Sequence, residues 1–398
     1  MSGIWSIVLA FAIAAPSQKG ADLAAVDDFI SNRKYASAFR MLDEKDPRNE
    51  DPARLEKKIS LALGFSAATV MHRSFTFIDL GPGQDLDDYN ITPEAFNPYN
   101  AYDFQIDAIL RALIRKKPGN ARLHFLLGDF YFRMQRQYGD TWFVGGEELL
   151  RLAGEAFALA DKGKGLDRSG LDEYALVSAM QKNYTKAVSL YARALRQDPS
   201  YAEGNYGIAY AYHMSGDQAK AFGHALKALD GFKDRLSKSD ASMLAAISAD
   251  AMNRPAEALT YYRKARELGR VDFLSAKKIL CFSLDIEEET RWHEEAAALL
   301  DLDPHNLEYY YELLECFIDR GRGASIEKFL ASYEAKRGKD GRARGNILLL
   351  KSAFFSKVVN DPAKRRDALK KAYAEFGKIF PESDEVMLMI KKELERKD

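Results

Sequence analysis

Cysteine is scarce in this chain of 398 residues, since only Cys281 and Cys316 are present. Two cysteines are too few for a disulfide framework or for a zinc site built from cysteine alone, and the compartment cannot be read from them. An excess of one charge is also lacking, because 58 Lys and Arg residues stand against 59 Asp and Glu residues. A balanced chain has no global field that favours nucleic acid or an anionic membrane surface. We therefore expect no nucleic-acid partner.

The motifs that usually carry chemistry are missing as well. No glycine run ends in Gly-Lys-Ser or Gly-Lys-Thr, so the sequence has no phosphate-binding loop. The six histidines show neither the HExxH spacing nor a grouping with Cys or carboxylates that suits zinc. No nucleophile elbow is present. We therefore expect a protein that is not an enzyme, without catalytic residues, metal or cofactor.

Long apolar runs are absent except at the N-terminus, where residues 4–15 read IWSIVLAFAIAA. A run of 12 residues has the length of a signal-peptide core and is too short to span a bilayer. Ala12 and Ala14 offer a cleavage pattern, whereas no basic residue precedes the run and Pro16 disfavours cutting directly before it. We predict that residues 1–20 are a signal peptide or an apolar N-terminal segment, and that the protein is exported to the periplasm or secreted. The alternative is a buried first helix in a cytoplasmic protein. No transmembrane span is expected in the mature chain.

A three-residue pattern recurs six times along the chain, with its first members 34, 34, 37, 34 and 34 residues apart. In each copy, a small or apolar residue is followed by another apolar residue four positions later and a third after three more. The copies are Ala153, Phe157, Ala160; Ala187, Tyr191, Ala194; Ala221, Ala225, Ala228; Ala258, Tyr262, Ala265; Trp292, Ala296, Leu299; and Ile326, Leu330, Tyr333. Five copies have a further apolar position 12 residues upstream, namely Ala175, Ala209, Ala246, Leu280 and Leu314. This period predicts repeated helix pairs whose small side chains permit close approach.

The repeats resemble the tetratricopeptide repeat. The first unit carries the family residues His124, Leu127, Gly128 and Tyr131, and Pro199 and Pro304 close two later units, although the family Trp is absent throughout. The resemblance implies an all-α fold, a tetratricopeptide-type α-solenoid of stacked antiparallel helix pairs with two aromatic-rich insertions and a C-terminal capping helix. It implies N-terminal helical repeats over residues 21–120, six repeats over 121–340, and a helix pair with a capping helix over 341–398.

Several local signals refine this organisation. Ser200 and Glu203 form a capping-box pattern, and Gly216 and Gly321 fall at turns between paired helices. Before and after the repeats, helices are expected over residues 22–31, 34–45, 52–71, 102–116, 343–358, 363–379 and 383–396. One insertion adds about 13 residues around QYGDTWFVGGEE. The other, residues 72–101, holds Phe75, Phe77, Tyr89, Phe96 and Tyr99. We expect these aromatic residues to pack against the helices, with the lining of a site as the alternative.

The candidate site follows from the stacking that the resemblance implies, in which the first helix of each pair lines a concave groove. The stripe opposite the core contains the predicted partner-binding residues Phe125, Asp129, Phe132, Arg133, Met180, Tyr206, Tyr210, His213 and Met243. We interpret the protein as a non-enzymatic protein-protein interaction scaffold that binds a peptide or protein segment of basic or mixed charge. In a second interpretation, the aromatic residues of the stripe only meet neighbouring helices. A third is an exported accessory protein that captures a small hydrophobic ligand for a transporter.

Overall fold

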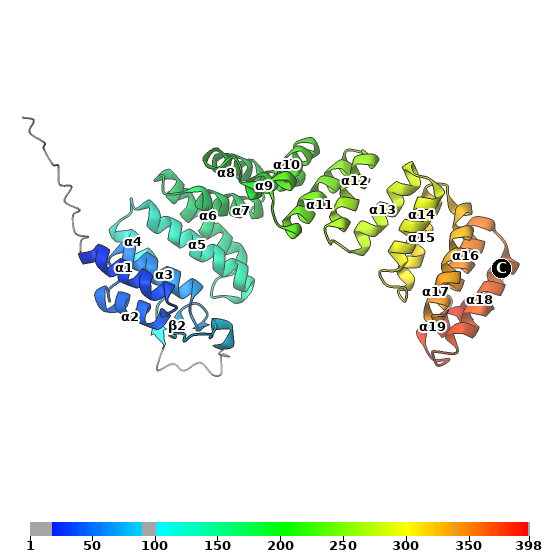
Figure 1. Ribbon diagram of the computed structural model, residues 1–398, viewed down its shortest axis with the longest axis horizontal. Helices are drawn as coiled ribbons and strands as arrows, with labels where there is room; N and C mark the ends of the chain where they lie inside the picture. Colours follow the sequence, from blue (N-terminus) through cyan, green and yellow to red (C-terminus); the bar gives the residue numbers. More distant parts are fainter. Residues whose placement is uncertain (1–17, 90–100, 338, 397–398) are drawn as a thin grey trace, which may run out of the picture. The chain divides into compact units, whose positions relative to one another are not determined.

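The computed structural model describes residues 18–89, 101–337 and 339–396. The chain divides into two compact units, residues 1–183 and 184–398, and each is described by itself. Both are built from helix pairs, as predicted (Figure 1). Within the described residues, no helix combines the length and the apolar character needed to cross a bilayer. The predicted signal peptide lies outside the described residues.

In its described residues the first unit contains seven α-helices and a small antiparallel sheet. The helices are α1 (Gln18–Ser31), α2 (Tyr35–Lys45), α3 (Pro52–Gly64), α4 (Ile106–Lys116), α5 (Ala121–Tyr138), α6 (Gly146–Lys162) and α7 (Arg168–Met180). The sheet has the order β1 (Ala68–Val70), β2 (Ser74–Thr76), β3 (Tyr102–Asp103), and the short 3-10 helices are η1 (Leu86–Tyr89) and η4 (Gly139–Thr141).

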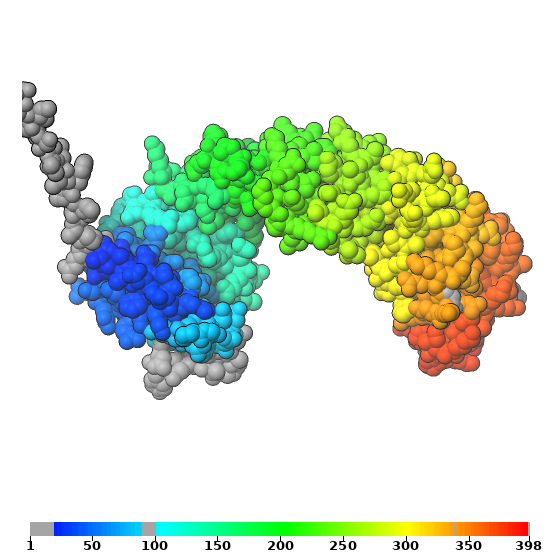
Figure 2. Space-filling view, in the orientation of Figure 1, coloured from blue at the N-terminus to red at the C-terminus, as the bar shows by residue number. Residues whose placement is uncertain are grey.

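The second unit consists of helices stacked pair upon pair. They are α8 (Tyr184–Gln197), α9 (Ala202–Ser215), α10 (Gln218–Gly231), α11 (Arg235–Ala251), α12 (Pro255–Glu267), α13 (Phe273–Ile286), α14 (Glu289–Leu300), α15 (Leu307–Asp319), α16 (Ile326–Arg337), α17 (Gly341–Phe354), α18 (Pro362–Phe376) and α19 (Glu385–Glu395). A 3-10 turn, η5 (Gly323–Ser325), precedes α16, and a π-helical turn, η6 (Phe355–Val359), follows α17. Within this unit, the side on which α11, α13 and α15 lie is hollowed (Figure 2).

The repeat pattern accounts for the core. All eighteen residues of the six three-residue copies are buried, and so are the five upstream positions. Small residues at these positions let helix axes approach closely, and the bulky ones fill the space between successive pairs. His124, which stands where the family has Trp, is also buried, and its Nε2 lies 2.9 Å from the carbonyl oxygen of Pro118. The all-α repeat fold predicted from the sequence is therefore confirmed.

Helix ends follow local side-chain chemistry, with one exception to the prediction. Asp51 accepts hydrogen bonds from the backbone N–H groups of Ala53 and Arg54 at the start of α3. Gly216 ends α9 with a φ of 91°, a conformation that glycine adopts without strain. The capping box at Ser200 is wrong, because the Ser200 hydroxyl donates to the carboxylate of Asp198 at 2.6 Å and α9 begins only at Ala202.

The segment after α3 is also corrected, since the helix predicted over residues 52–71 ends at Gly64. The chain then forms a hairpin in which Thr69 pairs with Phe75, and Tyr102 adds the third strand. Phe75 is fully buried, and Phe77 stacks on Phe39 of α2 with ring centroids 4.3 Å apart. The predicted packing of these two insert aromatics is confirmed. Phe96 and Tyr99 lie outside the described residues.

The two insertions meet each other at the tip of this hairpin. Met71 and His72 both have positive φ, 51° and 53°, as a type I′ turn requires, although Asn and Gly are the usual residues of such a turn. Side chains of the second insertion contact both Met71 and His72. Trp142 Nε1 donates to the Met71 carbonyl oxygen at 2.9 Å, and His72 Nδ1 lies 2.8 Å from the Tyr138 hydroxyl. The extra residues of one insertion therefore fix the turn of the other.

Cys281 on α13 and Cys316 on α15 form a disulfide, with their Cα atoms 5.6 Å apart. Both residues are buried in the core of the second unit. The bond joins the first helices of two consecutive pairs, which are 35 residues apart in sequence. It fixes how these two repeats stack on each other.

Candidate functional site

Two of the predicted partner-binding residues in the first unit are core residues. Phe125 is only 8% exposed, and its ring centroid lies 6.0 Å from that of Phe157. Phe132 is likewise buried. The prediction that Phe125 and Phe132 line an open groove is therefore corrected. Their surroundings agree with the second interpretation, in which the aromatic residues of the stripe meet neighbouring helices. Asp129 and Arg133 lie one helical turn apart on α5, and Arg133 Nε donates to Asp129 Oδ1 at 2.7 Å.

Asp129 is accompanied by an acid that the sequence analysis did not select. Glu173 of α7 is largely buried, and its Oε2 atom has no hydrogen-bond partner. Burial, reinforced by the nearby Asp129 carboxylate, raises the pKa of Glu173 to about 8. Burial also raises the pKa of Asp129. No sequence motif marks Glu173, because its position depends on how α7 packs against α5.

Met180, another predicted residue, lies at the end of α7 and is 41% exposed. It lines a cavity of about 780 Å³ in the first unit. The other lining residues include Gly145 and Glu148 from the second insertion and the first turn of α6. Most of the lining residues are polar or charged, and Leu150 and Met180 are the apolar side chains among them. The structure brings Met180 to the insertion and leaves it apart from Phe125 and Phe132, which are buried.

In the second unit, the predicted residues separate into exposed and buried members. Tyr210 is 42% exposed on α9, and Tyr206 and His213 are half-buried on the same helix. Met243 of α11 is only 7% exposed and belongs to the core, so its predicted place in the groove is corrected. His213 Nδ1 lies 2.9 Å from Gln218 Oε1, which fixes its ring. Tyr210 thus presents the largest open surface among these four residues.

The surroundings of Tyr206 combine aromatic and charged groups. Its ring packs against Phe232 with the centroids 6.1 Å apart. Burial and the nearby Asp240 carboxylate raise the pKa of the Tyr206 hydroxyl, so this group remains protonated at neutral pH. Asp240 itself accepts a hydrogen bond from Arg270 at 3.0 Å. The tyrosine hydroxyl groups and the ion pair of Asp240 with Arg270 offer polar contacts beside the aromatic surface of Tyr206 and Phe232.

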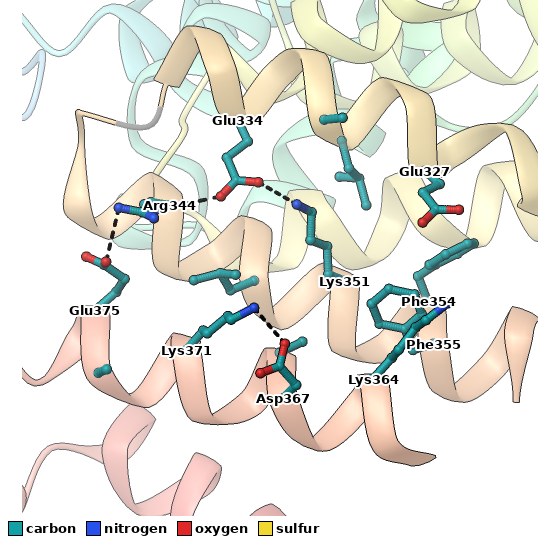
Figure 3. A pocket seen from close by; sticks show the side chains of 15 residues that line it. Glu327, Glu334, Arg344, Lys351, Phe354, Phe355, Lys364, Asp367, Lys371 and Glu375 are labelled. Carbon is teal, nitrogen blue, oxygen red and sulfur yellow. Dashed lines mark hydrogen bonds and ion pairs between the residues drawn. The ribbon is translucent and has the colours of Figure 1, made fainter. Parts of the chain in front are cut away.

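A cavity of about 600 Å³ lies between α16 and α18, with α17 as its floor (Figure 3). Leu330, Leu348 and Phe354 line it with apolar surface and are themselves buried. Small side chains also line the walls, Ala331 on α16 and Ala368 and Ala374 on α18. Alanine fills less space than a larger side chain would at these positions. The cavity was not predicted, because no sequence motif marks these alanines.

Ion pairs close one end of this cavity. Arg344 of α17 bridges both walls, with its guanidinium 3.7 Å from Glu334 of α16 and 3.2 Å from Glu375 of α18. Lys351 pairs with Glu334 from the floor, and Lys371 pairs with Asp367 at 2.7 Å on α18. The charged side chains of the rim at this end therefore neutralise one another (Figure 3).

The other end of the cavity remains open around Phe354 and Phe355. Phe355 begins the π-helical turn that follows α17 and is half-buried, with its ring centroid 5.3 Å from that of Phe354. The Lys364 ammonium lies 5.6 Å from the centroid of Phe355, and Glu327 stands on the opposite wall. An aromatic floor between opposite charges can hold an apolar side chain together with charged neighbours.

No arrangement for catalysis emerges at these places. Within residues 18–89, 101–337 and 339–396, no group of three or more His, Cys, Asp and Glu side chains is placed to hold a metal ion. The cavities and the exposed Tyr210 offer contact surface.

Comparisons with known proteins address the repeats directly. A tetratricopeptide repeat profile matches residues 180–235, which include α8, α9 and α10. A comparison with curated proteins finds no match. The solved structure of Naa15/Naa10 bound to HypK-THB is 15% identical and has a TM-score of 0.50, covering 95% of this chain and 50% of that chain. YrrB, described as a TPR protein with an unusual peptide-binding site, is 19% identical with a TM-score of 0.37, covering 48% of this chain and 96% of that chain.

PilF of Pseudomonas aeruginosa is 15% identical with a TM-score of 0.36, covering 67% of this chain and 97% of that chain. At identities this low, the likeness to solved structures concerns the fold alone. The profile match rests on the repeat residues themselves and falls within the region where the sequence shows its regular period. The match therefore shows tetratricopeptide repeat sequence over residues 180–235, and the stacked helix pairs on both sides of this stretch have the same all-α repeat fold.

Proposed function

We propose that this protein is a non-enzymatic scaffold that binds a segment of a protein partner on the exposed face of α9 in its second unit. Tetratricopeptide repeat proteins generally mediate protein-protein interactions. The observation that carries the proposal is Tyr210, which is 42% exposed on α9 beside the half-buried Tyr206. We call the surface of Tyr206, Tyr210 and His213 the tyrosine face. Tyrosine rings bury large areas at little entropic cost and often anchor partners.

The charges around the tyrosine face favour a partner segment of basic or mixed charge. Glu203 is exposed at the start of α9 and Asp240 lies beside Tyr206. Asp240 is paired with Arg270. An incoming cation would therefore share the Asp240 carboxylate with this arginine, whereas it would not share the Glu203 carboxylate with it. Complementary charges at the rim of such a surface mainly set orientation and association rate.

The experiment compares Tyr210→Ala with Tyr212→Ala, a matched variant on the same helix. Tyr212 packs towards α10, where its ring centroid lies 6.0 Å from that of His224. A photo-crosslinking residue at position 210 first identifies the partner segment in the native source, and titration of the synthetic segment then gives its affinity. We expect Tyr210→Ala to weaken binding at least tenfold and Tyr212→Ala to leave it nearly unchanged. Equal affinity in the two variants, both folded, would remove the tyrosine face from the proposal.

We also propose that the protein is exported. Two observations support this, the apolar run at residues 4–15 and the disulfide between Cys281 and Cys316. Structural disulfides persist in oxidising compartments and are rare in the cytosol. Fractionation of the native cells, with N-terminal sequencing of the protein, tests the proposal. An intact N-terminus in the cytosolic fraction would contradict it.

Capture of a small hydrophobic ligand gains no support from the cavities. Such a function would need a closed apolar cavity beneath the first insertion. Four cavities of the described residues, including the two described above, have no lining residue from 72–89. The aromatic residues Phe75 and Phe77 fill the space under the hairpin themselves.

A further inference from the structure

We propose that the cavity between α16 and α18 is a second docking site, which takes a partner segment with a large apolar side chain between a basic and an acidic residue. This site is independent of the tyrosine face. It lies in later repeats, and its walls are the second helices of their pairs, whereas Tyr206 and Tyr210 lie on a first helix. A partner could therefore occupy either site without the other.

The first argument is the unfilled apolar surface. The walls contribute small side chains to the lining, among them Ala331 of α16 and Ala368 of α18. Leu348 and Phe354 on the floor belong to the core, yet they line a space of about 600 Å³. That volume lies within the range of sites that receive a side chain or a small ligand. An incoming apolar side chain would gain about 25 cal/mol for each Å² of apolar surface removed from water.

The second argument concerns which charges remain for a partner. Eight charged side chains line the cavity, and they are Glu327, Glu334, Arg344, Lys351, Lys364, Asp367, Lys371 and Glu375. Six of them pair with one another within the rim. Glu327 is exposed on α16, and the described residues offer its carboxylate no hydrogen bond or ion pair. Lys364 of α18 is held only loosely, with its ammonium 3.7 Å from Asp361.

These two charges select the chemistry of the occupant. Glu327 and Lys364 stand on opposite walls at the open end, with Phe354 and Phe355 between them (Figure 3). A segment that crosses this end would place its apolar side chain over the two rings. A basic residue on one side of that side chain would reach Glu327, and an acidic residue on the other would reach Lys364. Opposite charges in this order fix the direction of the segment as well as its position.

The experiment selects binders from a phage-displayed library of 12-residue peptides against the full chain and measures the affinities of the selected peptides. Ala331→Trp fills the cavity from an exposed position on α16, and Ala335→Trp, one turn later and outside the cavity, is its matched control. We expect selected peptides to lose at least tenfold in affinity with Ala331→Trp and less than twofold with Ala335→Trp. Circular dichroism establishes that both variants fold.

Charge reversal then tests the direction of the segment. Glu327→Lys should weaken the same peptides about tenfold, and exchange of their basic residue for Glu should restore the affinity. Glu385→Lys, which reverses an exposed charge on α19, should have no effect. Tyr210→Ala should also leave these affinities unchanged, so failure of the tyrosine face and failure of this site are distinguishable. Peptides that bind equally well to Ala331→Trp, or that bind only through apolar residues without response to Glu327→Lys, would overturn the proposal.

Discussion

The ring of Phe376 on α18 lies directly against the backbone of Gly345 on α17, where an added Cβ would come within 2.5 Å of the ring. Replacing Gly345 with alanine must therefore displace a buried ring. We expect Gly345→Ala to lower the free energy of unfolding by about 1–3 kcal/mol, the usual cost of overpacking a core. Urea denaturation followed by circular dichroism measures the change.

The matched control for this substitution is Gly223, which lies inside α10 with no atom within 4 Å of an added Cβ. Alanine is a better helix former than glycine by about 1 kcal/mol in a helix interior. Gly223→Ala should therefore stabilise the protein. Destabilisation of equal size by both substitutions would show that the Phe376 ring is not the cause.

The buried Glu173 predicts a stability that depends on pH. Its pKa is about 8 in the folded protein, above the ordinary value of 4.5, because of burial and the Asp129 carboxylate. Between these two pH values the unfolded chain releases the proton while the folded chain keeps it, so stability falls as the pH rises. Glu173→Gln should remove the loss of stability that the ionisation of Glu173 causes. It should therefore raise the thermal midpoint at pH 9 relative to wild type. At pH 4 the two proteins should differ little, and an equal difference at both pH values would contradict the prediction.

Trp142 should hold the hairpin turn at Met71. Trp142→Phe removes the donor to the Met71 carbonyl oxygen and keeps an aromatic ring, so we expect a loss of about 1 kcal/mol in the free energy of unfolding. Amide hydrogen exchange of residues 67–76 should become faster. Trp292→Phe is the control, because Trp292 donates in the same way to the Glu287 carbonyl oxygen in the second unit. Faster exchange of the hairpin in that variant would argue against a local effect.

The sequence was sufficient for the repeats because their contacts are local and periodic. Ala187, Tyr191 and Ala194 identify a buried helix face by their spacing alone, and the structure buries all three. The hairpin after α3 could not be predicted in the same way. Its strands have three residues each, and the buried Phe75 lies beside the rings of Phe77 and Phe104, the second of which comes from the segment before α4. Helical spacing over residues 52–71 therefore extended the predicted helix beyond its true end.

The candidate sites were less predictable, for a physical reason. Spacing on one helix places Tyr206 and Tyr210 on a common face, but exposure depends on the neighbouring helices. Phe125 and Met243 were assigned to the same stripe by the same helical spacing as the two tyrosines, yet both are buried. The cavity at α16 and α18 is lined by small residues such as Ala331 and Ala368, which lie 37 positions apart in sequence and come to line one space only after folding.

The last prediction concerns the disulfide between Cys281 and Cys316. Cross-linking residues 35 positions apart restricts the unfolded chain, and bonds of this kind typically stabilise a protein by about 2–4 kcal/mol. Thermal unfolding of the wild type with added reductant should therefore begin at a lower temperature than without it. The Cys281→Ser/Cys316→Ser double variant should unfold at the lower temperature under both conditions. These are the only cysteines in the sequence, so any response to reductant must come from this pair. A wild-type protein that shows two free thiols when denatured without reductant, and no shift with it, would contradict the prediction.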